Sequence, residues 1–105
     1  MTASMPDLAA MQQHATEASA LLKALAHPTR LMVMCWLVQG EASVGALQEQ
    51  VGLSMSALSQ HLAVLREAEL VSTRKEAQTV FYSVKPGPAL EIMRTLHGVY
   101  CGGDH

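Results

Sequence analysis

The stretch that decides the fold runs from Ser43 to Glu69 and reads SVGALQEQVGLSMSALSQHLAVLREAE. It contains two segments with helical spacing of apolar residues, and Gly52 separates them. Ser43 and Ser54 precede the two segments and are residues that cap helices. A helix, a glycine-containing turn and a second helix with a small, polar outer face predict a helix-turn-helix. The buried stripe of the second helix is predicted to consist of Met55, Leu58, Leu62 and Leu65.

The segment that follows changes its period from helical to alternating. Residues 71–84 read VSTRKEAQTVFYSV and alternate around a polar centre from Lys75 to Gln78. This pattern predicts a β-hairpin, which in this position is the wing of a winged helix. Pro86, Gly87 and Pro88 end the hairpin, and a last helix with the sequence ALEIMRTLHGVYC follows.

Two more helices are predicted before the helix-turn-helix. The first spans about residues 7–25, and its apolar seam either packs on its own domain or forms a dimer interface. His27-Pro28 ends this helix, because the residue before a proline avoids the helical region. The second helix runs from Pro28 to about Gln39 and contains LMVMCWLV, which is apolar on nearly every side and therefore predicted to be buried. The fold class is therefore mainly α with a β-hairpin wing.

Length and composition predict one domain. Of the 105 residues, 50% are hydrophobic and 15% are charged, which is enough apolar material for a core. We expect a disordered tail at 1–6, the winged helix domain at 7–101 and a flexible tail at 102–105. No apolar run reaches the roughly 18 residues that span a bilayer, and no signal peptide is present, so we expect a cytoplasmic protein without membrane contact. No catalytic motif stands above chance, so no enzyme and no cofactor are predicted.

Read in this order, the chain resembles the ArsR/SmtB family of winged-helix repressors. The resemblance covers about residues 15–101 and rests on LAHPTRL at 25–31, LSMS at 53–56, SQHLAVL at 59–65, and the hairpin ending in FYSV at 81–84. It implies an obligate homodimer, an inverted-repeat operator and repression relieved by a small inducer. The implied interface uses the first and last helices, with these residues as candidates: Leu8, Met11, Ala15, Ala18, Leu22, Met93, Leu96 and Tyr100.

The net charge of −2 counts against nucleic-acid binding, but basic residues gather around the segment expected to meet DNA. The second helix of a helix-turn-helix enters the major groove, where the Gln60 amide can read adenine. Hydroxyl groups, His61 and the polar residues of the hairpin can contact bases or backbone. Each of these residues, taken singly, could also be a solvated surface residue. The domain as a whole could also be a winged helix that binds protein. The candidate DNA-contacting residues are Ser54, Ser56, Ser59, Gln60, His61, Arg74, Lys75 and Gln78.

Metal-sensing members of the family carry cysteines in the helix-turn-helix or an Asp/His/His/Glu set in the last helix, and this chain departs from both patterns. Residues 43–51 contain no cysteine, and the last helix offers only Glu91 and His97. His97 and Cys101 are four residues apart, with His105 nearby, so a metal site, including one shared across a dimer, stays open as an alternative. We therefore predict no metal ligand among the site residues.

Two cysteines remain, and they are expected to be thiols at rest. Cys35 lies in the second helix, where it is predicted to be largely buried, and Cys101 ends the last helix. Their placement resembles the dithiol subgroup of the family, the BigR, SqrR and YgaV type, which responds to persulfides and other reactive sulfur. That resemblance implies a Cys35–Cys101 switch that releases the operator. The alternative is a constitutive regulator in which both cysteines are structural.

Overall fold

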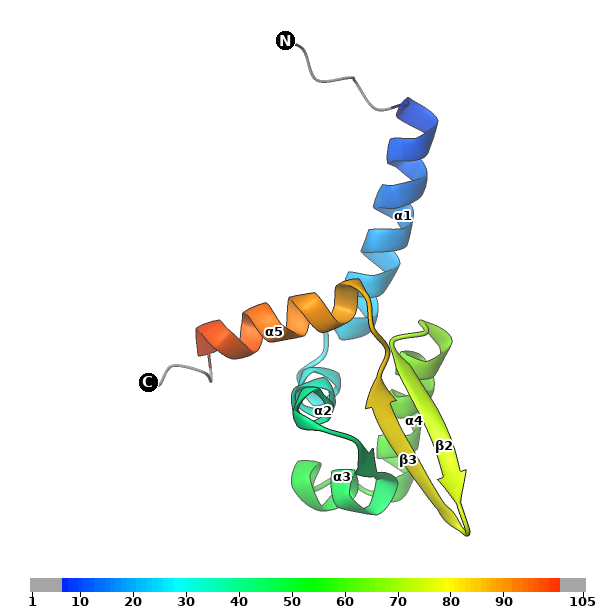
Figure 1. The fold of residues 1–105 in the computed structure, drawn as a ribbon, viewed down its shortest axis with the longest axis vertical. Helices are drawn as coiled ribbons and strands as arrows, with labels where there is room; N and C mark the ends of the chain where they lie inside the picture. The colour runs from blue at the N-terminus through cyan, green and yellow to red at the C-terminus, as the bar shows by residue number, and fades with distance from the viewer. Residues whose placement is uncertain (1–6, 101–105) are drawn as a thin grey trace.

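The computed structural model describes residues 7–100, which form five helices and one three-stranded antiparallel sheet (Figure 1). The predicted winged helix-turn-helix is confirmed, with the wing immediately after the second helix of the motif. In chain order the elements are α1 (Leu8–Leu25), α2 (Pro28–Gln39), β1 (Ala42–Ser43), α3 (Val44–Val51), α4 (Met55–Glu67), β2 (Val71–Glu76), β3 (Thr79–Val84) and α5 (Pro88–Tyr100).

Local sequence explains where the helices begin. The side chains of Asp7, Ser43 and Ser54 each accept a hydrogen bond from the backbone N–H three residues further on. These bonds satisfy backbone donors that have no partner within the first turn of a helix. Pro28 and Pro88 occupy the first positions of α2 and α5, where a missing N–H costs nothing.

The core lies where α2 packs against α3, α4, α5 and β3. Val33 and Met34 of α2 and Leu58 and Leu65 of α4 have no exposed surface. Removing this apolar surface from water is the main stabilising contribution to a domain of this size. The other buried residues are Ala24, Leu25, Leu37, Leu47, Leu62, Leu70, Val71, Tyr82, Ala89 and Met93.

The sheet has the order β1-β3-β2. The wing pairs β2 with β3 from Val71↔Val84 to Glu76↔Thr79, which leaves two residues for the turn. β1 adds the pairs Ala42↔Tyr82 and Ser43↔Phe81 on the other side of β3. This strand was not predicted, because two residues are too few to show an alternating pattern.

Helix α1 stands away from the rest of the molecule (Figure 1). It bends by 93° from α2, and only Ala24 and Leu25, at its end, are buried. The resulting radius of gyration is 16.1 Å, against about 13 Å for a compact domain of this length. Most of α1 therefore makes no contact with the core of its own chain.

Two expectations about burial were wrong. Met55 was predicted to belong to the buried stripe of the second helix of the motif, but it is 41% exposed, because it sits in the first turn of α4, where no other element covers it. Helix α2 was predicted to be buried on nearly every side, but Met32 and Trp36 are exposed. Only one face of α2 meets the core, and the other remains open in the single chain.

No single helix within residues 7–100 is long and apolar enough to cross a membrane. Helices α1 and α2 are long and apolar enough only if their lengths are combined, and the two helices are bent by 93° relative to one another.

Candidate DNA-binding surface and cysteine site

The turn between α3 and α4 orients the predicted recognition helix. Gly52 ends α3 with a φ of +72°, a left-handed conformation that glycine adopts without steric cost. The side-chain amide of Gln48 donates a hydrogen bond of 3.2 Å to the carbonyl of Leu53, which fixes the turn from the α3 side. Leu58, Leu62 and Leu65 then anchor α4 in the core. The exposed face of α4 is thereby set at a defined angle to the rest of the molecule.

That exposed face carries the predicted serines and glutamine. Ser56, Ser59 and Gln60 are all exposed, as expected for residues on the side of α4 that faces away from the core. Ser54 is exposed too, but its hydroxyl oxygen accepts a 3.1 Å hydrogen bond from the N–H of Ala57. Ser54 therefore serves as the cap of α4, and its O–H donor and second lone pair remain available to another partner. The exposed Met55 extends the same surface. The sequence did not reveal this, because the spacing of Met55 matches that of the buried stripe.

His61 differs from its neighbours, because it is half-buried and held by two residues at the start of α2. Its Nδ1 lies 3.2 Å from an Nη atom of Arg30, and its ring centroid lies 4.4 Å from that of His27. Burial, together with the charges of His27 and Arg30, lowers the pKa of His61. Arg30 also donates a 2.6 Å hydrogen bond to the carbonyl of Ala24. The cluster therefore ties α4 to the junction of α1 and α2.

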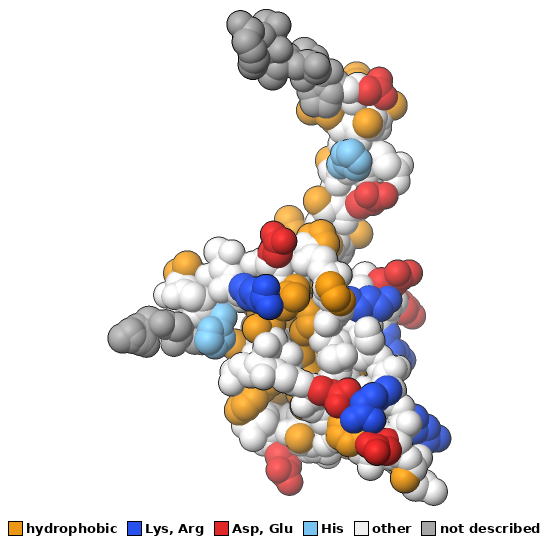
Figure 2. All heavy atoms as spheres, in the orientation of Figure 1, with side chains coloured by type: hydrophobic (Ala, Val, Ile, Leu, Met, Phe, Trp, Pro, Cys, Tyr) orange, Lys and Arg blue, Asp and Glu red, His pale blue; other side chains and the backbone are white. Residues whose placement is uncertain are grey.

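The wing does not present its basic residues equally. Lys75 and Gln78 are exposed at the far end of the hairpin, where Ala77 and Gln78 form the turn. Arg74 lies further back and is engaged with two carboxylates, those of Glu41 and Glu76. Figure 2 shows acidic and basic side chains intermingled over this part of the surface. The structure therefore places Lys75 and Gln78 at the tip of the wing, whereas Arg74 is held away from the tip by its ion pairs.

Two other basic residues near this surface, Arg66 and Lys85, also have partners. Arg66 donates a 2.6 Å hydrogen bond to the hydroxyl of Tyr82, which joins α4 to β3. Lys85 lies 3.8 Å from the carboxylate of Glu69. Among residues 7–100, no ion pair involves Lys75. A hollow of about 480 Å³, bordered by Ser43–Gly45 of β1 and α3 and by Gln78–Val80 of the wing, separates the start of α3 from the wing.

Cys35 lies in the wall of a cavity of about 470 Å³ between α2 and α5. It is partly buried and packs against the core, without being sealed inside it. The reason is that α5 covers only part of the Cys35 side of α2 and leaves this cavity open to the surface. Cys101 lies outside the described residues, but its predecessor Tyr100 also lines this cavity. The full set of lining residues is Leu31, Met32, Cys35, Met93, Leu96, His97 and Tyr100.

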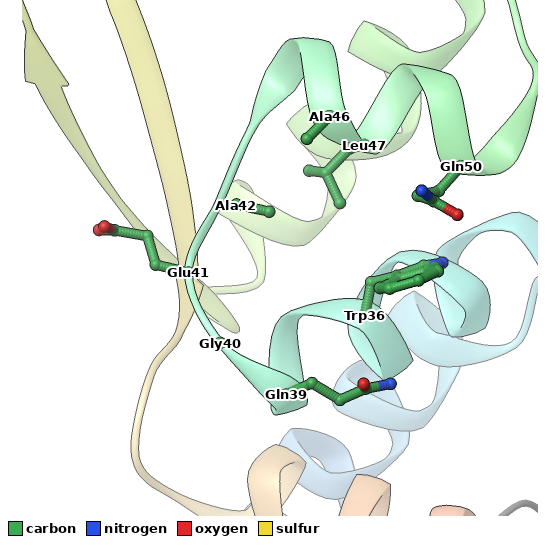
Figure 3. A pocket seen from close by; sticks show the side chains of 8 residues that line it. All are labelled: Trp36, Gln39, Gly40, Glu41, Ala42, Ala46, Leu47 and Gln50. Atoms are coloured by element: carbon green, nitrogen blue, oxygen red, sulfur yellow. The ribbon is translucent and has the colours of Figure 1, made fainter.

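A second, smaller cavity of about 280 Å³ lies at the C-terminal end of α2 (Figure 3). The indole of Trp36 forms one wall, with the side chains of Gln39 and Gln50 beside it, and Glu41 points away from it. Within residues 7–100, no three histidine, cysteine or acidic side chains lie together as ligands for a metal ion.

The predicted dimer residues fall into two groups. On α1, Leu8, Met11 and Leu22 are between 47% and 67% exposed, and the alanines of the same seam are exposed as well. On α5, Tyr100 is 79% exposed and Leu96 is half-buried. Met93 is buried in the core of its own chain, because it faces α2, and it is therefore not accessible to a partner.

A helix-turn-helix with an exposed polar face on its second helix, followed at once by a wing, defines a winged helix-turn-helix DNA-binding protein. A family model described as "Bacterial regulatory protein, arsR family" matches residues 27–73. Together with a relative that is 47% identical over 92% of this chain, this match shows that the chain belongs to the ArsR family of bacterial transcriptional regulators.

Three similar proteins agree with this assignment. The biofilm growth-associated repressor of Agrobacterium fabrum is 47% identical over 97 residues, which cover 92% of this chain and 83% of the relative. The structure of reduced HlyU from Vibrio cholerae has a TM-score of 0.85 at 48% identity and covers 90% of this chain and 99% of that one. The structure of the transcriptional repressor BigR from Xylella fastidiosa has a TM-score of 0.81 at 39% identity. The match covers 94% of this chain and 100% of that one.

Proposed function

We propose that this protein is a homodimeric repressor that binds an inverted-repeat operator and releases it when reactive sulfur species modify Cys35 and Cys101. The observation that carries the sulfur response is the cavity beside Cys35. Its far wall includes Tyr100, the residue that precedes Cys101 in the sequence. The same cavity is apolar and open to the surface, so a small, uncharged sulfur species can reach Cys35. The resemblance to BigR and to HlyU, a protein whose structure was solved in a reduced form, supports the same function.

The proposed DNA interface consists of the exposed face of α4 and the wing. Gln60 is the residue there whose amide can pair with both the N6 and the N7 of adenine. Ser56 and Ser59 flank it on the same exposed surface. Two such helices in a dimer would read half-sites about one helical turn apart. His61 is a positioning residue in this proposal, since its ring faces Arg30 and His27.

Replacing Gln60 with alanine should weaken discrimination at one base position in each half-site, by about 1–3 kcal/mol. The measurement is selection of bound sequences from a randomised duplex library, followed by titration of the selected operator and its single-base variants. Gln39→Ala is the matched control, because Gln39 is exposed at the end of α2 and away from α4. An equal loss of affinity for all sequences would instead identify Gln60 as a backbone contact.

The proposed chemistry consumes only a persulfide, RSSH. The Cys35 thiolate attacks the outer sulfur of the persulfide, so that RS⁻ leaves and a protein persulfide forms. Attack of the Cys101 thiolate on the inner sulfur closes a disulfide and expels HS⁻. If both cysteines carry a persulfide, their reaction closes a trisulfide and expels hydrogen sulfide. The persulfide is the oxidant in each case, and no other electron acceptor is needed.

Helix α2 offers a route from this chemistry to the DNA-binding surface. It carries Cys35 near its middle and Arg30 in its first turn, and Arg30 contacts His61 of α4. A covalent link from Cys35 to Cys101 would restrict the position of α2. It would thereby also affect the contact between Arg30 and His61. A coupling free energy of about 1–3 kcal/mol is enough to lower operator affinity several-fold to a hundredfold.

The proposed function is tested by measuring intact mass and operator binding on the same protein before and after a persulfide donor. We expect a Cys35–Cys101 link and a loss of DNA affinity within the range given above. Cys35→Ser and Cys101→Ser should each bind DNA as the reduced protein does and should no longer respond. Parallel arms with peroxide and zinc separate this response from general oxidation and from metal sensing.

Two outcomes would contradict the sulfur response. An unchanged mass, or a changed mass with unchanged DNA binding, would make the cysteines structural and the regulator constitutive with respect to sulfur. Release of DNA by zinc that persists in Cys35→Ser would favour the metal-responsive alternative, for which His97 in the cavity wall is the available ligand among the described residues.

A further inference from the structure

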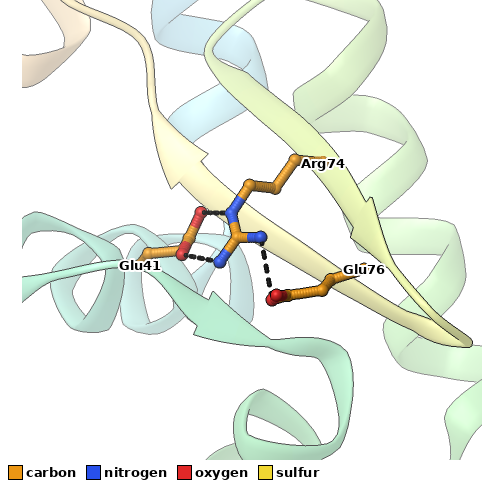
Figure 4. A network of polar contacts seen from close by, with 3 residues as sticks. All are labelled: Glu41, Arg74 and Glu76. Atoms are coloured by element: carbon orange, nitrogen blue, oxygen red, sulfur yellow. Dashed lines mark hydrogen bonds and ion pairs between the residues drawn. The ribbon is translucent and has the colours of Figure 1, made fainter.

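Glu41 and Arg74 form a bidentate ion pair that crosses the sheet (Figure 4). Arg74 starts on the outer strand β2, and its guanidinium lies 4.5 Å from the ring centroid of Phe81 on the central strand β3. Its Nε and one Nη then each donate a 2.8 Å hydrogen bond to Glu41, which precedes β1. The other Nη donates a 3.1 Å hydrogen bond to Glu76. Glu41 therefore binds Arg74 across the central strand β3, which lies between β1 and β2.

This arrangement changes the charge that the wing presents. The three side chains together carry two negative charges and one positive charge, so Arg74 adds no net positive charge to this face. The Arg74 hydrogen bond also lowers the pKa of Glu41, which keeps that carboxylate ionised. An exposed ion pair of this kind contributes little to the stability of the fold, and both Glu41 and Arg74 are well exposed.

The geometry also matches that of the ligand expected at this surface. A carboxylate and a phosphate both offer two oxygens to the forked donors of an arginine, in the same bidentate manner. The Nε and Nη donors that face Glu41 are therefore the ones that a DNA backbone phosphate would use. Because the pair is exposed, a phosphate can displace the carboxylate without opening the core.

We propose that Glu41 sets the DNA affinity of the wing by competing with a backbone phosphate for the guanidinium of Arg74. This inference rests on the proposed role of the wing in DNA binding. It assigns Glu41 as an affinity-determining residue that touches no DNA itself. Arg74 contributes a phosphate contact only after it has left Glu41, so part of its interaction with DNA is offset by the ion pair that it loses.

The test is a double-mutant cycle on the dimer with Glu41→Gln, Arg74→Ala and the combined variant. The DNA is a labelled mixed-sequence duplex of about 30 base pairs, enough for two half-sites one helical turn apart. Binding is titrated over a series of salt concentrations. Glu41→Gln should raise affinity about three- to tenfold and steepen the salt dependence by about one counterion for each Arg74 that is released. In the Arg74→Ala background, the same substitution should change affinity and slope little.

Glu91→Gln is the matched control, because it removes the same charge from an exposed position on α5. A gain in affinity with Glu41→Gln that persists in full without Arg74 would overturn the proposal, since Glu41 would then act only through its own charge. A loss of affinity would overturn it as well, because Glu41 would then hold Arg74 in its DNA-bound position. Equal binding by the wild type and Arg74→Ala would show that Arg74 makes no contact with DNA, and this would also overturn the proposal. Failure of the wild type to bind any duplex, operator included, would instead count against the proposed function.

Discussion

Replacing Leu58 with alanine is expected to lower the free energy of unfolding by about 2–5 kcal/mol. Leu58 lies in the second turn of α4 and has no exposed surface. Its truncation would remove apolar contacts within the core and leave a cavity that the rigid surroundings can fill only in part. Urea unfolding followed by circular dichroism measures the change, at one fixed protein concentration because a dimer is stabilised by association.

Ser59→Ala is the control for this substitution, because Ser59 is the next residue of the same helix and is exposed. We expect it to change stability by no more than about 0.5 kcal/mol. A loss below about 1 kcal/mol for Leu58→Ala would show that α4 is not anchored through this side chain. The consequence for function is direct, because the same leucine stripe orients the surface that carries Gln60.

Replacing Leu22 with glutamate on α1 is expected to dissociate the proposed dimer. Leu22 is 53% exposed, although it borders a hollow beside Pro88 and Ile92 of α5, and only the last two residues of α1 are buried. An apolar seam on a projecting helix is stabilised by a partner helix, and a carboxylate buried within that seam would not be compensated. Loss of the second half-site contact should weaken operator binding by about 10²–10⁴-fold, which is the advantage of linked binding sites.

Analytical ultracentrifugation and operator titration measure the two effects on the same sample. Ala9→Glu is the control, since it places the same charge on α1 on the side away from the apolar seam, in the first turn where acidic residues favour a helix. If Leu22→Glu remains a dimer with unchanged affinity, the interface does not include this part of α1. A wild-type protein that sediments as a monomer would contradict the dimer altogether.

The features that could be predicted are those that depend on neighbours in the sequence. Ser43 and Ser54 cap helices because their side chains reach backbone groups only three residues away. Gly52 marks a turn because it permits a left-handed backbone, and Pro28 marks the start of a helix. The wing follows from its alternating residues. Each of these signals is local, so the succession of helices, turn and hairpin was predictable, and the ArsR family with it.

The contacts that adjust the candidate site are long-range and could not be predicted. Arg74 meets Glu41 across 33 positions, and Arg30 meets His61 across 31. No periodicity encodes such pairs, because they depend on which side of β3 each strand joins and on where α2 meets α4. The short strand β1 decides the first pair by placing Glu41 beside the wing.

Burial at the edges of the molecule was also decided only by tertiary packing. Met55 has the spacing of a core residue, yet no element covers the start of α4. Met93 matched the candidate interface of the last helix, yet α2 covers it within the chain, and Cys35 borders a cavity because α5 leaves part of α2 open. Local sequence thus determined which elements form and in what order, since capping and periodicity act over a few residues. Only the three-dimensional arrangement decided which faces of those elements are covered, because coverage depends on partners distant in the chain.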